Sequence, residues 1–272
     1  MSSFIILVTD FGCSFYVGQM KGVIKKINPK AEVIDLCHDI ESQNIIQASV
    51  VIGSSYRYFP EGTIFVCVID PTVGSDRDIL ILKTQDYIFL APNNGILTTV
   101  INKNKKFHIF KVYNDKFFLH PTSNTFHGRD IFSPVAAYLS MDLNYLKEIC
   151  QPYYKTKLKI IKDLFPKKER FYGTNRLIGK AIFYDKFGNI VTNFDTSVYK
   201  NLKKSKLIQI FHNDELIKEV AIKKSYFEVK QGEFIAYVNS FGYLEVAINC
   251  GNAYEYLNSN GYKLEKLKFL VI

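Results

Sequence analysis

The pattern of apolar residues changes halfway along this chain of 272 residues, and that change limits the possible folds most. Across the first 150 residues, short apolar runs alternate with stretches of helical periodicity. Strands are expected at 4–8, 32–37, 63–69, 79–83 and 87–90, and helices at 17–27, 44–58 and from about residue 95. The alternation predicts an α/β layer fold with a largely parallel sheet.

The second half is dominated by short strands separated by turn residues. Six strands are expected, at 177–184, 189–193, 206–211, 216–222, 234–239 and 243–249. So many strands with little helix between them predict a smaller, all-β, barrel-like domain. We therefore expect an N-terminal α/β domain over 1–160, a basic connector over 161–176 and a C-terminal β domain over 177–272.

The net charge of +9 is concentrated in one part of the chain. Residues 1–150 carry 14 basic and 14 acidic side chains, so the whole excess lies in 151–272. Within 151–180, nine basic residues face only Asp163 and Glu169. No nucleic-acid-binding motif accompanies this stretch, so a solvated connector is favoured and no nucleic-acid partner is expected. No apolar run approaches the roughly 18 residues of a membrane span, so no membrane partner is expected either.

The five cysteines are widely spaced and form no CxxC pair. Free thiols in a reducing cytoplasm are the favoured interpretation, and we expect no metal site, because clustered His and Cys ligands are lacking. The N-terminus has neither a basic leader nor a small-residue cleavage site, so no signal peptide is expected.

Polar clusters follow the predicted strands, where α/β sheets bind their ligands. Three such clusters stand out, at 9–12, 70–77 and 91–95, and a fourth polar cluster, at 125–130, opens a predicted helix. The chain has no GxGxxG turn, no GxxxxGK[ST] loop and no GxSxG elbow, so dinucleotide, phosphate-loop and serine-nucleophile chemistries are disfavoured. The clusters predict a site of another kind in the first domain.

Seven segments in these and later regions carry a family resemblance. They are TDFG at 9–12, YVGQMKGVI at 16–24, VIDPTVGSDR at 68–77, APNNGILTTV at 91–100, TFHGRDIF at 125–132, FGNIVTN at 187–193 and NSFGYLEVAINCGNA at 239–253. Over nearly its whole length the chain resembles the S-adenosylmethionine hydroxide adenosyltransferases, relatives of the fluorinase and chlorinase. The resemblance implies hydrolysis of S-adenosylmethionine to adenosine and L-methionine, by attack of water at ribose C5′. It also implies a homotrimer with active sites between subunits, and no metal or organic cofactor.

The resemblance assigns the handling of the attacking water to Asp70, Arg77 and His127. The leaving group departs as a neutral thioether and needs no acid, whereas water is a poor nucleophile until it loses a proton. His127 is a plausible proton acceptor, with an ordinary pKa of roughly 6.5. Arg77 would hold it neutral and stabilise a nascent hydroxide, and Asp70 would orient the water or Arg77. The sequence leaves open which of the three takes the proton.

The resemblance also assigns seven substrate-binding residues. They are Asp10 for both ribose hydroxyls, Asn189 and Tyr226 for the adenosine and its adenine ring, Asp185 and Ser240 for the methionine amine and carboxylate, and Asn249 and Cys250, whose backbone meets the adenine edge. A carboxylate suits paired hydroxyls because it has two acceptor oxygens.

Departures from the halogenase pattern favour hydroxide over halide. The halogenases carry Tyr where Asp70 stands, Thr where Val73 stands and Tyr-Ser where His127-Gly128 stand. They also insert a longer loop where this chain has the tight connection 83–86. A halide pocket without that Thr and Ser lacks its hydroxyl donors, so water is the expected nucleophile.

Two departures from the hydroxide-type pattern accompany the intact catalytic residues. The loop after Gly12 is one residue short and lacks the usual acidic residue, which could alter contacts to the methionine end. Thr72 replaces a usual glycine, which would strain a backbone of positive φ. The alternative function is a non-catalytic module that binds adenosine or S-adenosylmethionine.

Overall fold

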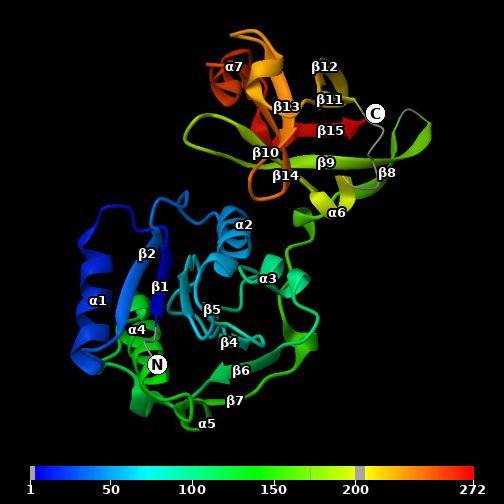
Figure 1. The fold of residues 1–272 in the computed structure, drawn as a ribbon. Coiled ribbons are helices and arrows are strands. Elements are labelled where there is room, and N and C mark those ends of the chain that lie inside the picture. The colour runs from blue at the N-terminus through cyan, green and yellow to red at the C-terminus, as the bar shows by residue number, and fades with distance from the viewer. Residues whose placement is uncertain (1–3, 172, 200–205) are drawn as a thin grey trace. The chain divides into compact units, whose positions relative to one another are not determined.

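The computed structural model describes residues 4–171, 173–199 and 206–272, and the chain divides into two compact units, Met1–Ile161 and Lys162–Ile272. The first unit is an α/β layer structure and the second is a barrel-like antiparallel sheet (Figure 1). The predicted fold class is therefore confirmed. Within the described ranges, none of the helices combines the length and the apolar character that crossing a bilayer requires.

The N-terminal sheet has seven strands in the order β2-β1-β3-β5-β4-β6-β7. Their bounds are β1 (Phe4–Thr9), β2 (Glu32–Cys37), β3 (Ile64–Val68), β4 (Ile79–Lys83), β5 (Ile88–Pro92), β6 (His108–Val112) and β7 (Cys150–Pro152). Strands β2, β1, β3 and β5 run parallel, and β4, β6 and β7 extend the sheet in antiparallel pairings. The sequence did not predict β6 and β7, because one is short and mixes apolar with basic residues and the other has three residues.

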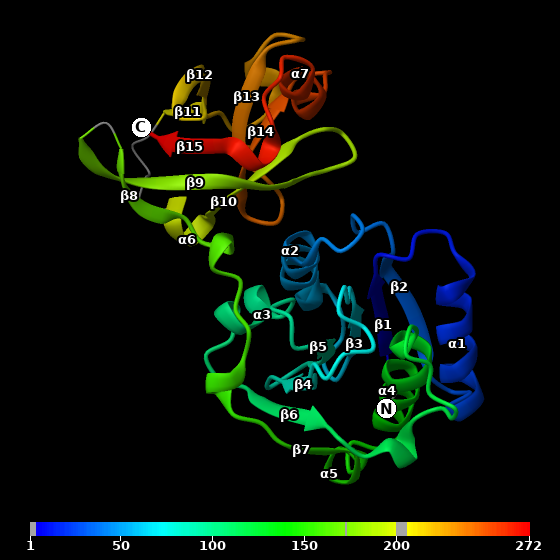
Figure 2. The same cartoon turned by 180° about the vertical axis from the view of Figure 1, so that it is seen from behind.

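Helices cover both faces of this sheet (Figures 1 and 2). The helices are α1 (Phe15–Ile27), α2 (Ile45–Ser55), α3 (Thr98–Lys103), α4 (Ser133–Met141) and α5 (Tyr145–Ile149). Side chains of β1 alternate between the two cores: Ile5 and Leu7 pack with α1 and α4, while Ile6 and Val8 pack with α2 and α3. Successive side chains of a strand point to opposite faces of the sheet. Both sets are apolar here because helices cover both faces.

This topology brings the first two polar clusters together. Strands β1 and β3 are parallel neighbours, with Thr9 paired to Val68 at their carboxyl ends. Asp10 and Asp70 follow directly at that edge. Adjacent parallel strands end on the same side of a sheet, so residues 60 positions apart in sequence are delivered to one place.

The C-terminal unit is a curved sheet of eight strands. Its elements are β8 (Lys167–Phe171), β9 (Thr174–Tyr184), β10 (Ile190–Asp195), α6 (Thr196–Tyr199), β11 (Leu207–His212), β12 (Glu215–Ala221), β13 (Phe234–Val238), β14 (Tyr243–Ile248), α7 (Ala253–Ser259) and β15 (Leu267–Val271). The order is β12-β11-β15-β9-β10-β14-β13, with β8 paired to β9. A bridge between Ile222 and Ala236 brings the two ends of this order together, which makes the sheet nearly a closed barrel.

Two strands here were not expected. Strand β8 lies within the stretch that the sequence assigned to the connector, where it pairs with β9 over five consecutive register positions. Strand β15 completes the centre of the barrel sheet between β11 and β9. Its residues Leu267, Phe269 and Val271 belong to the apolar core. Strand β8 has the sequence KKERF, four charged residues before one aromatic, and β15 has the sequence LKFLV, an apolar run interrupted by Lys268. Neither shows the period-two alternation of a half-buried strand.

The turn at 70–77 takes its positive φ at Gly74 and not at Thr72, so Thr72 meets no backbone strain. Gly74 has φ +83°, and a Cβ built there would lie 2.3 Å from the backbone oxygen of Asn124. Gly62 has φ +85° but nothing within 4 Å of such a Cβ. A side chain at Gly74 would meet both backbone strain and a steric clash, whereas one at Gly62 would meet backbone strain alone.

We predict that Gly74→Ala destabilises the N-terminal unit by about 2–4 kcal/mol, because it adds a backbone clash to the strain of positive φ. Gly62→Ala, with the strain alone, should cost only about 1–2 kcal/mol. Equilibrium urea unfolding measures both. Equal losses of unfolding free energy for the two variants would contradict the steric contact.

Candidate active site

The N-terminal unit contains a cavity of about 310 Å³ at the carboxyl ends of β1 and β3. Three of the polar clusters contribute to it. Its lining residues are Asp10, Phe11, Ser42, Gln43, Val68, Asp70, Pro71, Val73, Thr125, Phe126, His127 and Gly128. The sequence-predicted residues Asp10, Asp70 and His127 therefore border one cavity.

Arg77 joins Asp70 to His127. Its Nε donates to Asp70 Oδ2 over 2.7 Å, and its Nη2 also contacts that oxygen. The same Nη2 lies 2.9 Å from His127 Nδ1. The side chains of Arg77 and Asp70 are only 5% and 3% exposed, so the ion pair is shielded from water. In such surroundings a charge-assisted pair holds its geometry firmly.

The contact with Arg77 determines the tautomer of His127. A guanidinium has only donors, so Nδ1 must accept and the ring proton of the neutral imidazole sits on Nε2. Burial lowers the pKa of His127, and the positive charge of Arg77 lowers it further, against the opposing effects of Asp70 and Asp130. His127 is thus held neutral, with an N–H to donate from Nε2.

A π-helical turn over Gly128–Phe132 begins directly after His127 and leads into α4. Asp130 within it is fully buried and accepts from the backbone of Ser123 over 2.8 Å and from Arg129 Nε over 2.6 Å. Arg129 also lies over the ring of Phe126, 5.2 Å from its centroid. These contacts fix the chain on both sides of the imidazole.

Asp10 is held by a loop of unusual conformation. Its Oδ2 accepts from the backbone N–H of Gln43 over 2.8 Å, and Gln43 has φ +65°, in the left-handed region. Beneath it, the buried Thr9 hydroxyl lies 2.9 Å from His38 Nδ1, and His38 Nε2 lies 3.0 Å from Asp35. A strained residue held by its surroundings is a common feature of ligand sites.

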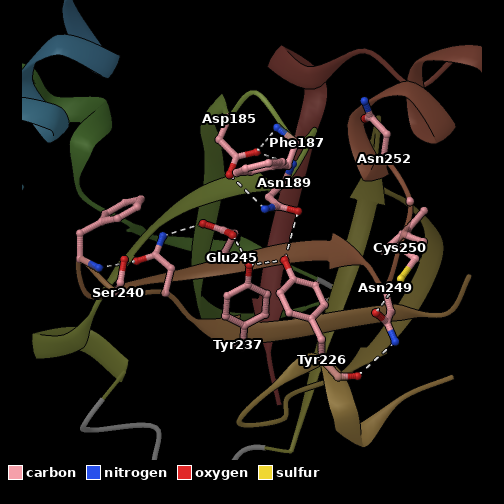
Figure 3. Close-up of a pocket in the computed structure, with 14 residues that line it drawn as sticks. Asp185, Phe187, Asn189, Tyr226, Tyr237, Ser240, Glu245, Asn249, Cys250 and Asn252 are labelled. Atoms are coloured by element: carbon pink, nitrogen blue, oxygen red, sulfur yellow. Dashed lines mark hydrogen bonds between the residues drawn. The ribbon is translucent and has the colours of Figure 1, made fainter. Parts of the chain in front are cut away.

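The C-terminal unit contains a larger pocket, of about 940 Å³ (Figure 3). All six site residues that the sequence placed in this half line it: Asp185, Asn189, Tyr226, Ser240, Asn249 and Cys250. They come from the loop after β9, the start of β10, the turn before β13 and the ends of β13 and β14. Residues spread over 66 positions thus meet in one pocket.

Asp185 organises the loop that carries Asn189. Its Oδ1 accepts the backbone N–H groups of Phe187 and Asn189, each over 2.9 Å, and its Oδ2 accepts from Asn189 Nδ2 over 3.0 Å. Gly188 has φ +78° in this turn, a conformation suited to glycine. Asp185 therefore shapes the pocket wall in addition to offering its carboxylate to the pocket.

The sequence did not single out three polar residues that line the same pocket, Tyr237, Asn239 and Glu245. Glu245 was detectable, because it is the one charged residue within the apolar strand 243–248. Among the described lining residues two are carboxylates and none is Lys, Arg or His. The lining favours a ligand that carries positive charge.

Comparison with known proteins assigns both units to one family. The N-terminal domain model of the SAM hydroxide adenosyltransferases matches residues 5–149, and the C-terminal domain model matches residues 179–262. The (R)-S-adenosyl-L-methionine hydrolase of Methanocaldococcus jannaschii is 35% identical, over 93% of this chain and 91% of the relative.

More distant relatives and a solved structure agree with this result. The (R)-S-adenosyl-L-methionine hydrolase of Thermus thermophilus is 27% identical over 93% of this chain and 94% of its own, and the fluorinase of Nocardia brasiliensis is 25% identical over 88% of each. The crystal structure of a conserved protein from Thermotoga maritima matches over 100% of both chains, with TM-score 0.82 and 33% identity. The chain belongs to the SAM hydroxide adenosyltransferase family.

Proposed function

We propose that this chain hydrolyses S-adenosylmethionine to adenosine and L-methionine. The observation that carries the proposal is the buried Arg77 between Asp70 and His127, beside a cavity that Asp10 also borders. Asp70 supplies a carboxylate, and Arg77 and His127 supply hydrogen-bond donors. With Asp10 as the carboxylate for the ribose, this set fits the activation of water next to a nucleoside.

Asp70 is the best placed proton acceptor of the three residues. Arg77 has no acceptor, and His127 already receives Arg77 at Nδ1 and carries its proton on Nε2. Asp70 Oδ1 receives only the Thr72 hydroxyl, at 3.2 Å, and each carboxylate oxygen has two lone pairs. Attacking water becomes more acidic as its bond to carbon forms, so a carboxylate is a sufficient base.

Arg77 and the Nε2–H of His127 then act as donors to the oxygen that develops negative charge. The oxygen forms a bond to C5′ while the C5′–S bond breaks, and sulfur keeps the electron pair. The products are adenosine, methionine and one proton, which passes from water through Asp70 to solvent. This balance needs substrate and water only, so we propose that no metal or organic cofactor takes part.

The remaining predicted residues would bind substrate. Asp10 would accept both ribose hydroxyls, with its position fixed by Gln43. The C-terminal pocket offers aromatic rings and two carboxylates to a substrate with a sulfonium and an ammonium group. Tyr226, Asn189, Asn249 and Cys250 would take the adenosine, and Asp185 and Ser240 the amino-acid end.

The two hydrolases compared above have names that specify the R form of the substrate. We propose the same configuration at sulfur here. Purified protein incubated with each sulfur epimer should release adenosine and methionine faster from the R epimer, as measured by chromatography. Asp70→Asn should lower kcat roughly 10²- to 10⁴-fold, because it removes the base and the partner of Arg77. Tight calorimetric binding of substrate without product from either epimer would instead identify a non-catalytic binding module.

The acid side of the pH–activity profile should report His127. Protonation at Nδ1 would set two donors against each other and break the contact with Arg77, so activity is lost as pH falls through the lowered pKa of His127. We predict that kcat/KM stays high below pH 6.5 and then declines. His127→Asn should move this decline to lower pH, where loss of the carboxylate base limits activity, and His108→Asn, the same change on the exposed histidine of β6, should leave it in place. A decline unchanged in His127→Asn would refute the assignment.

We propose that the chain forms a homotrimer, because its predicted substrate residues are divided between two units and the resemblance places each site between subunits. Light scattering should give three times the chain mass of 31.4 kDa. The exposed Tyr16 packs against Phe11 and Phe126, which line the N-terminal cavity, and the exposed Phe15 packs against Tyr16. Phe15→Glu should therefore reduce both assembly and activity, and a fully active monomer would rule the trimer out.

We further propose a cytoplasmic location, since the five cysteines are free thiols. The expected partners are the small-molecule substrate and other copies of this chain, without nucleic acid or membrane. The basic residues near the start of the C-terminal unit are accounted for in part by local pairs, such as those of Lys167 and Lys180 with Asp163.

A further inference from the structure

A chain of hydrogen bonds crosses the C-terminal pocket from one carboxyl group to another (Figure 3). Glu245 is bonded to the Tyr237 hydroxyl, which lies 2.6 Å from the Tyr226 hydroxyl. The Tyr226 hydroxyl lies 3.3 Å from Asn189 Oδ1, and Asn189 Nδ2 donates to Asp185 over 3.0 Å. Glu245, which is 3% exposed, thus connects through two tyrosines to a residue proposed to bind adenosine.

Among the residues that the structure describes, no basic side chain interacts with Glu245 from the elements packed around it. From β13 and the residue after it come Tyr237 and Asn239, whose Nδ2 donates to Glu245 Oε2 over 2.7 Å. On the β10 side its register partner is Val191, and the nearby charge is the carboxylate of Asp185. Burial raises the pKa of Glu245 and Asp185 raises it further, against the opposing bonds from Asn239 and Tyr237.

The direction in which these hydrogen bonds are donated depends on the proton of Glu245. Each tyrosine has a single hydroxyl proton, and burial raises the pKa of Tyr226 and Tyr237, so both stay protonated. When Glu245 is ionised, Tyr237 must donate to it and Tyr226 then donates to Tyr237. No proton remains between Tyr226 and Asn189 Oδ1, so two acceptor oxygens face the same space.

When Glu245 is protonated, the donor and acceptor exchange roles in the hydrogen bonds that join Glu245, Tyr237 and Tyr226. Glu245 donates to Tyr237, Tyr237 donates to Tyr226, and the Tyr226 proton is free for Asn189 Oδ1 or for a ligand acceptor. Asn189 itself cannot turn over to compensate, because Asp185 accepts only and therefore requires the amide nitrogen on its side. The pocket thus presents acceptors in one state and a donor in the other.

We infer that Glu245 is a positioning residue that sets, through Tyr237 and Tyr226, whether the pocket selects a purine nucleoside with an amino group or one with an oxo group at C6. The inference rests on the proposed function, because it assumes that a nucleoside occupies this pocket. An amino group can donate to both acceptor oxygens of the ionised state, whereas an oxo group needs the Tyr226 proton. Ionised Glu245 therefore favours adenosine over inosine.

The test is the ratio of adenosine affinity to inosine affinity, measured by calorimetry across pH on the full chain. In the wild type this ratio should rise as pH increases through the pKa of Glu245, which is above that of an ordinary glutamate. Glu245→Gln keeps the size of the side chain, can accept from Asn239 and must donate to Tyr237. It should fix the protonated direction, with a ratio lowered about five- to tenfold and independent of pH.

Two further variants make the result specific. Tyr237→Phe interrupts the chain, so it should give the same low, pH-independent ratio, and adding Glu245→Gln to it should change nothing more. Glu219→Gln, the same change at an exposed position of β12 where Glu219 pairs with Gln209, should behave as wild type. Circular dichroism identifies any variant that has lost its fold.

The outcomes separate this inference from the proposed function. A wild-type ratio at every pH in folded Glu245→Gln and Tyr237→Phe would overturn the inference and leave hydrolysis of S-adenosylmethionine untouched. Failure of both nucleosides to bind the wild type would overturn the inference together with the proposed nucleoside site. A pH-dependent ratio that disappears in both variants supports it.

Discussion

The chemistry of the N-terminal site depends on one guanidinium that can only donate. Because Arg77 donates to Asp70 and to His127, it fixes the position of the carboxylate and the tautomer of the imidazole at the same time. A lysine could supply the charge but not the planar set of donors that reaches both groups. In the proposed mechanism, the proton acceptor, the neutral imidazole and the site of developing negative charge all follow from the position of Arg77. The sheet serves this arrangement by ending β1 and β3 at the same edge.

Much of this arrangement could be predicted from the sequence, since strand ends, polar clusters and family motifs coincide. Asp70, Arg77 and His127 do lie together, and the six predicted residues of the second half do share one pocket. The assignment of the proton was beyond sequence, because it depends on which imidazole nitrogen meets Arg77. Gln43 was equally hidden, since nothing in its neighbourhood of the sequence indicates a left-handed residue that donates to Asp10.

Three of the four strands that escaped prediction share a physical feature, and the fourth, β7, has only three residues. Strands β6, β8 and β15 mix lysines with apolar residues, and a lysine on a strand can keep its head in water while its stem covers the sheet. Because of their charged residues, these segments resembled a connector or a loop in the sequence. The basic residues of β8 and β15 therefore obscured two strands of the barrel.

The lining of the N-terminal cavity explains why water should be preferred to a halide ion. Val73 and Gly128 occupy the positions where the halogenases carry hydroxyl side chains, and both line the cavity. A Cβ at Gly128 would lie 3.2 Å from the Phe126 ring and 3.3 Å from Met20 Sδ, so a serine there would require its neighbours to move. A desolvated halide needs several donors and no base, whereas water needs a base and fewer donors. The cavity supplies the carboxylate of Asp70 and has no hydroxyl at positions 73 and 128. This combination disfavours the anion and favours the activation of the neutral molecule.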